Sequence, residues 1–292
     1  MLIAVYGWGV EHEDFDALVQ FFESVREAGC TICLFEPLAR WLQSWFGYMP
    51  EDARLFGDTV PLGEGVRFLV SIGGDGTFLD SVQYVNGLDI PIVGINFGHL
   101  GFLASAHAGA VREVVDSLVS GHYQVERRAM AEAVVPLVRD GAPLYALNDV
   151  TIQKNSKSML VINVHIDGSF LCTYWCDGLI VSTPTGSTAY SLSVGGPIIV
   201  PYAETLLLSP IAPHNLNLRP LVLSDSSVIH IRATSRDPEM VLGVDAQVYR
   251  VTGACEMTIR RAASMVSVIR LRDDTFYGAL REKLKWGMDA RN

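Results

Sequence analysis

The chain has 292 residues, of which 49% are hydrophobic and 18% are charged, so it can bury a large core and is not a disordered chain. Its formal net charge is −10, and no basic run compensates for it, which argues against a nucleic-acid-binding surface. The uncharged stretch from Gly178 to Ala203 is long enough for a membrane span, but its prolines and glycines make it a poor helix, so we expect no membrane partner. Five scattered cysteines and an N-terminus that reads as a first strand, not as a signal peptide, predict a cytoplasmic protein.

Strands and helices alternate over the first 123 residues. Apolar runs at 2–6 and 32–35 predict buried strands, and the helical spacing of apolar side chains from Phe15 to Val25 predicts a helix that Gly29 ends. The same alternation continues with strands at 67–72 and 91–95 and a helix at 111–118. This β-α-β pattern predicts an α/β domain with a parallel sheet over residues 1–123.

A turn of three glycines around one carboxylate follows the strand at 67–72. It reads Gly73-Gly74-Asp75-Gly76-Thr77, and the apolar residues after it predict a helix that begins at Thr77. Glycine permits close backbone approach, and the first N–H groups of a helix lack partners, so such a turn can hold a phosphate. Asp75 would repel that phosphate unless it faces a metal ion or an acceptor hydroxyl, whereas a turn-forming role for it is an equally good interpretation of the local pattern.

A second glycine-containing loop follows the strand at 91–95, at residues 96–103. Ligands of open parallel sheets collect beyond the carboxyl ends of neighbouring strands, so we expect this loop and the Gly73–Thr77 turn to face one cleft. His99, in this loop, is interpreted as a phosphate contact or, slightly preferred, as a polar loop residue.

From residue 124 onward the pattern changes to strands alone. Apolar and polar residues alternate strictly at 160–166 and at 229–233, with turn residues between such segments, which predicts an antiparallel β-rich domain over 124–271. His165 and His230 are then ordinary residues of a sheet face. Asp273, Asp274 and Thr275 predict the cap of a last helix, and residues after Trp286 a solvated tail, within a segment 272–292.

Two stretches of the second half are polar within apolar surroundings. One is Asn148-Asp149, and the other is the segment from Asp177 to Ser193, which is rich in hydroxyl groups. Hydroxyls and backbone amides just before a helix suit a neutral polar ligand such as a base with its ribose. A Ser or Thr nucleophile for acyl transfer is the disfavoured alternative, because the chain has no Gly-x-Ser-x-Gly elbow.

Together these motifs resemble those of the NAD kinase family along nearly the whole chain. The Gly73–Leu79 turn alone is shared with diacylglycerol and sphingosine kinases and phosphofructokinase, whereas the Thr183–Ser191 stretch followed by Gly195-Gly196-Pro197 is far more specific. The resemblance implies a Rossmann-like N-terminal domain, a β-rich, sandwich-like C-terminal domain, and a C-terminal helix that returns to the first domain. It also implies transfer of the γ-phosphoryl group of ATP to the 2′-hydroxyl of the adenosine ribose of NAD.

The resemblance assigns roles to individual residues. Asp75 would orient or deprotonate the acceptor hydroxyl; Gly73, Gly74, Gly76 and Thr77 would approach phosphates; Asn148 and Asp149 would bind the nicotinamide-side ribose; and Thr188, Ala189 and Tyr190 would bind adenine. Asp177 would lie near the nucleotide, across a subunit boundary of a homodimer or homotetramer, and Phe102 would line the pocket. Further nucleotide-binding candidates are Asn96, Ser187, Ser193, Asp245 and Gln247. Mg²⁺ would enter with ATP, without assigned protein ligands.

Two positions depart from the family pattern: Ala246 stands in place of a glycine, and Phe97 in place of a small or basic residue. Two alternatives to an NAD kinase stay open at this point. One is a lipid or sugar kinase that shares the glycine turn, against which the hydroxyl-rich segment argues, and the other is a non-catalytic sensor of NAD or NADP.

Overall fold

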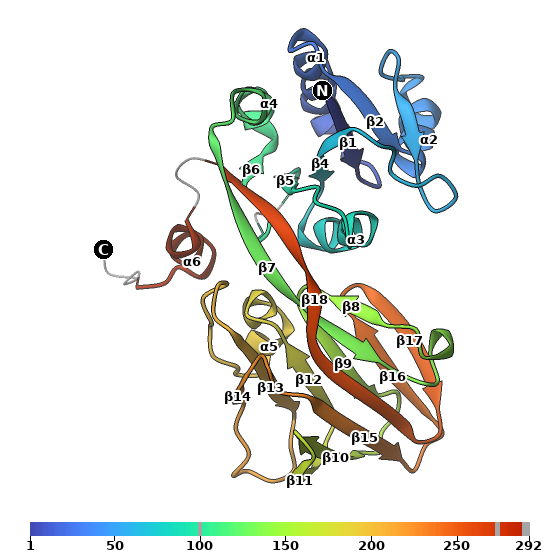
Figure 1. Cartoon of the computed structure of the whole chain (residues 1–292), viewed down its shortest axis with the longest axis vertical. Helices are drawn as coiled ribbons and strands as arrows, with labels where there is room; N and C mark the ends of the chain where they lie inside the picture. Colours follow the sequence, from blue (N-terminus) through green and yellow to red (C-terminus); the bar gives the residue numbers. More distant parts are fainter. Residues whose placement is uncertain (99–100, 272–274, 288–292) are drawn as a thin grey trace. The chain divides into compact units, whose positions relative to one another are not determined.

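The structure is a computed structural model that describes residues 1–98, 101–271 and 275–287. The chain forms two compact units, unit 1 from Met1–Arg127 with Val266–Asn292 and unit 2 from Arg128–Met265. The unit boundaries fall inside the two long strands β7 (Tyr123–Val134) and β18 (Cys255–Leu271), both labelled in Figure 1. The boundaries predicted at 123/124 and 271/272 lie close to the start of β7 and at the end of β18, a few residues from the unit boundaries. A sequence pattern marks where a strand begins or ends, but it does not report how the residues of that strand divide between two cores.

Unit 1 is built on a parallel sheet in the order β3-β2-β1-β4-β5, in which β18 and β6 also pair with β5. Its strands are β1 (Leu2–Tyr6), β2 (Thr31–Phe35), β3 (Arg54–Phe56), β4 (Val66–Ile72), β5 (Ile92–Asn96) and β6 (Ala106–His107). Its helices are η1 (His12–Asp14), α1 (Phe15–Glu27), α2 (Glu36–Phe46), α3 (Asp75–Val85), η2 (Ala108–Ala110), α4 (Val111–Ser120) and α6 (Phe276–Leu284).

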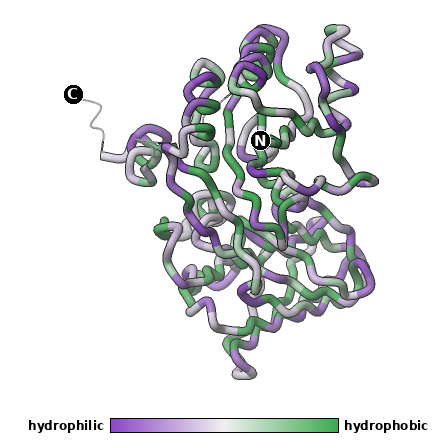
Figure 2. The backbone as a smooth tube through the Cα atoms, turned by 45° about the horizontal axis from the view of Figure 1, so that its top comes forward, coloured by the Kyte–Doolittle hydropathy of each residue, from purple (hydrophilic) through white to green (hydrophobic). Residues whose placement is uncertain are grey.

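The elements of unit 1 follow from its apolar pattern. Every residue of β1 and of β5 is buried, as expected for strands of a parallel sheet, which is normally covered on both faces. The helices are amphipathic, and in Figure 2 their turns alternate between hydrophilic purple and hydrophobic green. Gly47 and Gly121 end α2 and α4 in the left-handed region, at φ 61° and 78°. The predicted β-α-β organisation is confirmed, with α3 beginning at Asp75 instead of Thr77.

Unit 2 contains two antiparallel arrays of strands. One runs in the order β11-β10-β15-β18, with β7 paired to β18 and β8, and the other in the order β14-β13-β12-β9-β16-β17. Their bounds are β8 (Leu144–Ala146), β9 (Asp149–Lys154), β10 (Leu160–Ile166), β11 (Ser169–Cys176), β12 (Gly178–Ser182), β13 (Thr205–Ile211), β14 (Leu221–Ser224), β15 (Ile229–Ser235), β16 (Glu239–Val244) and β17 (Gln247–Thr252). The short helices are η3 (Arg139–Gly141), η4 (Thr185–Thr188) and α5 (Tyr190–Ser193).

One hydrophobic core joins the two arrays of unit 2. Ile162 and Ile231 come from the first array, Ile152 and Leu242 from the second, and all four are at most 3% exposed. Alternate residues of each strand supply this core, as the period-two pattern predicts. The β-rich, sandwich-like fold predicted for the C-terminal half is confirmed.

Three sequence-based expectations concern the C-terminal segment, the cysteines and a possible membrane span. Thr275 caps α6 by accepting a hydrogen bond from the Gly278 N–H at 3.0 Å, whereas Asp273, Asp274 and residues 288–292 lie outside the described residues. All five cysteines are free thiols. Over the described part of the chain, the helices lack the combination of length and apolarity required to span a bilayer.

Candidate functional site

The glycine turn joins β4 to α3 and leaves its outer side open. Gly73 has φ +141°, and a Cβ there would lie 2.5 Å from Thr77 Oγ1, so only glycine allows the chain to turn over Thr77. A Cβ on Gly74 or Gly76 would have no heavy atom within 4 Å among the described residues, and α3 begins without a side-chain cap. The start of this helix therefore offers backbone N–H groups to an incoming anion.

Asp75 is the first residue of α3, and backbone amides hold its carboxylate. Oδ2 accepts a hydrogen bond from the Phe102 N–H at 2.7 Å, and Oδ1 accepts one from the Leu103 N–H at 3.0 Å. A Cβ on Gly101 would lie 1.8 Å from Oδ1, so the backbone of this loop rests directly on the carboxylate. An ionised carboxylate has about four acceptor positions, so these two bonds orient Asp75 and leave it able to accept a substrate hydroxyl.

Two cationic side chains hold the loop that covers Asp75. Arg270, which is 6% exposed, donates to the Phe102 carbonyl at 3.2 Å and also bonds Glu126. The Lys283 ammonium group lies 4.6 Å from the centroid of the Phe102 ring. Arg270 could not be recognised from the sequence, where it is an arginine at the end of an apolar strand.

A cavity of about 410 Å³ opens at the carboxyl ends of three neighbouring strands, β1, β4 and β5. The residues that line it are Trp8, Gly9, Val10, Glu11, Gly73, Gly74, Asn96, Phe97 and Gly98. The prediction that the loops after β4 and β5 share one cleft is confirmed for Gly73–Gly74 and Asn96–Gly98, and the loop after β1 is a contributor that sequence reasoning missed. Asn96 is 2% exposed and accepts the Gly98 N–H at 2.8 Å. His99 lies outside the described residues.

In unit 2 the structure brings together the two polar stretches that the sequence singled out. The Asn148 carbonyl accepts the Thr183 N–H at 2.9 Å, and a Cβ on Gly186 would lie 2.1 Å from that carbonyl oxygen. Asp245, at φ +50° in the turn between β16 and β17, accepts from the N–H groups of Leu147, Asn148 and Asp149 at 2.7, 2.8 and 3.1 Å. Asp245 thus shapes the backbone of the Asn148-Asp149 pair.

The carboxyl group of Asp149 sits in an unfavourable place for charge. It is 8% exposed, and burial, together with the nearby Asp245 carboxylate, raises the pKa of Asp149 from 3.8 to about 7. Asp149 can therefore gain or lose a proton near neutral pH, and a cation or hydroxyl donor placed beside it would favour its ionised form.

Most hydroxyls of the 182–191 segment bond to the segment's own backbone. Ser187 is fully buried; it donates to the Pro184 carbonyl at 2.7 Å and accepts the Ile199 N–H at 2.9 Å. Thr188 bonds the Thr185 carbonyl at 3.2 Å. These hydroxyls determine the shape of the segment, so the residues that remain for a ligand are those at its exposed end: Ala189, Tyr190 and Ser193.

The remaining candidates of unit 2 have charged or polar neighbours. Asp177 forms an ion pair with Lys154 at 2.7 Å, and Gln247 accepts a hydrogen bond from Tyr249. Arg128, which is 3% exposed, reaches the Thr185 hydroxyl at 3.4 Å. Arg128 was missed by sequence reasoning, because nothing in a strand pattern tells a buried arginine from an exposed one.

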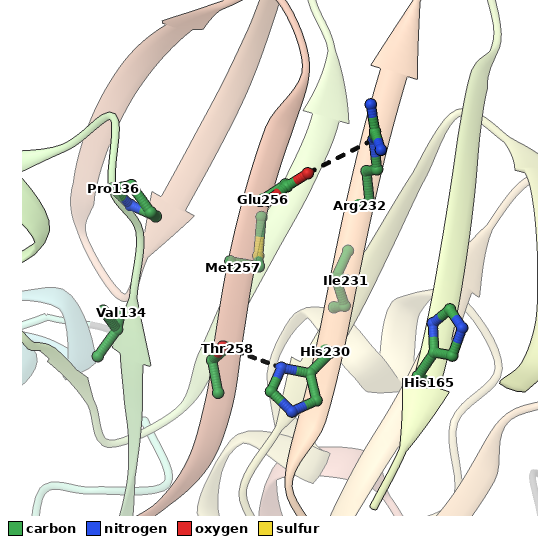
Figure 3. Close-up of a pocket in the computed structure, with 9 residues that line it drawn as sticks. All are labelled: Val134, Pro136, His165, His230, Ile231, Arg232, Glu256, Met257 and Thr258. Carbon is green, nitrogen blue, oxygen red and sulfur yellow. Dashed lines mark hydrogen bonds and ion pairs between the residues drawn. The ribbon is translucent and has the colours of Figure 1, made fainter. Parts of the chain in front are cut away.

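A second cavity, of about 240 Å³, lies in unit 2 on the face of a sheet formed by β10, β15 and β18 (Figure 3). His165, His230 and Thr258 stand in register across β10, β15 and β18, and His230 Nδ1 lies 3.0 Å from Thr258 Oγ1. Arg232 and Glu256 pair at 3.6 Å beside them. None of the predicted site residues lines this cavity, in agreement with His165 and His230 as ordinary face residues. Within the described ranges, no three His, Cys, Asp or Glu side chains cluster to hold a metal ion.

Comparison with known proteins assigns both halves of the chain. Residues 52–123 match the ATP-NAD kinase N-terminal domain, and residues 147–271 match the ATP-NAD kinase C-terminal domain. The chain belongs to the NAD kinase family. It is a kinase that phosphorylates NAD to NADP, and the family and the function predicted from the sequence are confirmed.

Full-length relatives of the NAD kinase family support this membership. The chain is 38% identical to an NAD kinase of Bacteroides fragilis and 35% identical to one of Christiangramia forsetii, in both cases over 296 aligned positions that cover 100% of each protein. Among solved structures, an NAD kinase from Archaeoglobus fulgidus in complex with ATP is 25% identical with a TM-score of 0.73 and covers 98% of this chain and 99% of its own. Yeast NADH kinase complexed with NADH has a TM-score of 0.89 at 23% identity, covers 99% of this chain and 88% of its own, and supports the fold.

Proposed function

We propose that Asp75 is the residue that prepares the 2′-hydroxyl of the adenosine ribose of NAD for attack on the γ-phosphorus of ATP. The observation that carries this proposal is the geometry of the carboxylate, held by two backbone amides at the open start of α3 beside a glycine-lined cavity. The ribose oxygen forms a bond to the γ-phosphorus while the bond to the β,γ-bridging oxygen breaks. The hydroxyl proton moves to Asp75, and ADP leaves.

Positioning supplies most of the rate in phosphoryl transfer, since the protein does little covalent chemistry there. The amides at Gly74, Gly76 and Thr77 stabilise phosphate oxygens at the positive end of the α3 dipole. The Gly73 N–H donates to the Ile95 carbonyl at 3.0 Å, so Gly73 contributes close backbone approach to the phosphates and not a hydrogen bond. Mg²⁺ would enter as its complex with ATP and would neutralise charge on the transferred group.

Unit 2 supplies the nucleoside contacts in this proposal. Asn148 and Asp149 bond ribose hydroxyls, and Thr188, Ala189 and Tyr190 present backbone and ring to the adenine. Asp245 acts through its bonds to the 147–149 backbone, so it is a positioning residue. Asn96, Phe102, Asp177, Ser193 and Gln247 complete the proposed nucleotide-binding set. Ser187, which is fully buried, acts through its bonds to Pro184 and Ile199 and shapes the segment.

We also propose a homodimer or homotetramer that works in the cytoplasm. Phe170 and Trp175, on the edge strand β11, are 60% and 50% exposed, which is typical of a strand that pairs with another subunit. Asp177 follows this strand, so its nucleotide contact would be made across that subunit boundary. Five free thiols fit a reducing compartment. Analytical ultracentrifugation tests the oligomer, and a single monomeric species at micromolar concentration would contradict it.

The decisive assay for the proposed function is NADP formation from NAD and ATP with Mg²⁺, followed with an NADP-specific dehydrogenase. NADP and ADP should appear in equal amounts. Binding of NAD without any product would identify a sensor, and phosphorylation of a lipid or sugar but not of NAD would identify the other kinase class.

A further inference from the structure

Trp8 is an exposed aromatic side chain beside the glycine turn. It has no role in the phosphoryl transfer proposed above. It follows β1, is 55% exposed and lines the 410 Å³ cavity together with Gly73 and Gly74. An indole so exposed leaves apolar surface in water, whereas the neighbouring Tyr6 and Phe35 are at most 2% exposed.

Several contacts hold the Trp8 ring in one orientation. It meets Tyr6 and Phe35 nearly edge to face, with interplanar angles of 79° and 85° and centroid distances of 6.1 and 5.4 Å. Its Nε1–H donates to Asp80 Oδ2 at 3.3 Å. Gly9 packs so closely on Trp41 that a Cβ there would lie 2.7 Å from the indole of Trp41, which fixes the loop itself. The exposed surface of Trp8 is therefore a preformed platform.

The charge of the cavity indicates which part of a nucleotide fits on this platform. Among the described residues that line it, Glu11 alone is charged, and Phe97 is aromatic. Such a lining suits an uncharged base and ribose, and a carboxylate in a Rossmann-like cleft commonly binds ribose hydroxyls. The start of α3, in the same cavity, suits the phosphates.

We propose that Trp8 stacks on the purine base of the phosphate donor, while Glu11 accepts hydrogen bonds from the donor's ribose. Asp80 is then a positioning residue for Trp8, five residues after Asp75 on the same helix. This inference rests on the proposed function, in which the donor triphosphate lies at the start of α3, and it adds the site of the donor's base.

The experiment compares Trp8→Ala, Trp8→Phe and the wild-type protein by isothermal titration calorimetry with two probes, the magnesium complexes of AMP-PNP and of inorganic tripolyphosphate. Stacking of a base on an aromatic ring changes affinity by about 5- to 150-fold. We expect Trp8→Ala to weaken AMP-PNP binding within that range and to leave tripolyphosphate binding unchanged. Trp8→Phe retains a ring and should bind AMP-PNP within about threefold of the wild type. Trp45→Ala, which removes an exposed tryptophan outside the cavity lining, is the matched control and should bind both probes normally.

Each other outcome overturns the inference. Unchanged AMP-PNP affinity of Trp8→Ala would show that the base does not stack on Trp8. An equal loss of affinity for AMP-PNP and for tripolyphosphate would show that Trp8 only shapes the loop. In a parallel titration of Trp8→Ala with NAD, weaker NAD binding with normal AMP-PNP binding would show that Trp8 contacts the acceptor. These titrations need no turnover, so they test the inference separately from the NADP assay. If the wild type makes NADP but Trp8→Ala binds AMP-PNP normally, the proposed function stands and the inference about Trp8 is wrong.

Discussion

The Gly73–Thr77 turn of unit 1 and the Thr183–Ala189 segment of unit 2 have the same local pattern and use it in opposite ways. Both join a buried strand to a helix through glycine and hydroxyl residues. The first leaves open space around Gly74 and Gly76, whereas in the second Gly186 packs against the Asn148 backbone and Ser187 is completely buried. One segment offers its backbone to a ligand, and the other uses its polar groups to hold its own shape.

The largest expected effect tests the open turn. Asp75→Asn removes the proton acceptor with little change of size, so kcat should fall by about 10²- to 10⁴-fold. NAD affinity, measured by calorimetry, should change little. Asp89→Asn, in the exposed loop after α3, is the control and should retain wild-type kcat. Unchanged turnover in a folded Asp75→Asn protein would exclude Asp75 from the mechanism.

The next effect tests how closely the second segment is packed. Gly186→Ala places a methyl group 2.1 Å from the Asn148 carbonyl oxygen, so we expect the free energy of unfolding to fall by about 3 kcal/mol or more. Gly76→Ala adds a methyl group in open space within α3 and should leave stability unchanged or raise it by up to about 1 kcal/mol. Urea denaturation measures both. Equal stabilities for the two variants would end the distinction between the segments.

An effect of intermediate size tests the buried Asp149, which follows the Asn148 backbone on which the second segment packs. Burial raises its pKa from 3.8 to about 7, so between these pH values the folded protein binds a proton that the unfolded chain releases. The contribution of Asp149 to stability is therefore greatest below pH 4 and is lost as the pH rises toward 7. Relative to Asp149→Asn, the wild type should lose about 3 kcal/mol between pH 4 and pH 7, since each pKa unit corresponds to about 1.4 kcal/mol.

Urea denaturation at several pH values measures this difference. Asp140→Asn, in an exposed turn, is the control and should follow the wild-type curve. Parallel pH profiles for the wild type and Asp149→Asn would contradict the raised pKa.

The smallest effect concerns a single buried hydroxyl. Ser187→Ala leaves the Ile199 N–H without its acceptor and should lower the free energy of unfolding by about 1–2 kcal/mol. Ser193→Ala, at the exposed end of α5, should change it by less than about 0.5 kcal/mol. Thermal denaturation of both variants measures these changes in stability. A Ser187→Ala protein of wild-type stability with impaired NAD binding would show that Ser187 contacts the ligand instead.

Much of the fold was predictable from the sequence because it depends on local periodicity. Continuous apolar runs such as 2–6 and strict alternation such as 160–166 identify strands of a parallel and an antiparallel array, and the Gly73–Thr77 turn marks a strand-to-helix junction. The order of the motifs along the chain was enough to indicate the family, since each motif is local and their succession is specific.

Only the tertiary structure decided how the polar residues are used. Asp75 and the Phe102 N–H are 27 positions apart, and Asp245 and the Asn148 N–H are 97 apart. No periodicity reports such pairs, because a loop's hydrogen-bond partners depend on which strands become neighbours. The same reason explains why Arg270, Arg128 and Trp8 were missed: their burial or exposure follows from packing between distant segments, while their residue types alone suit many places on a protein.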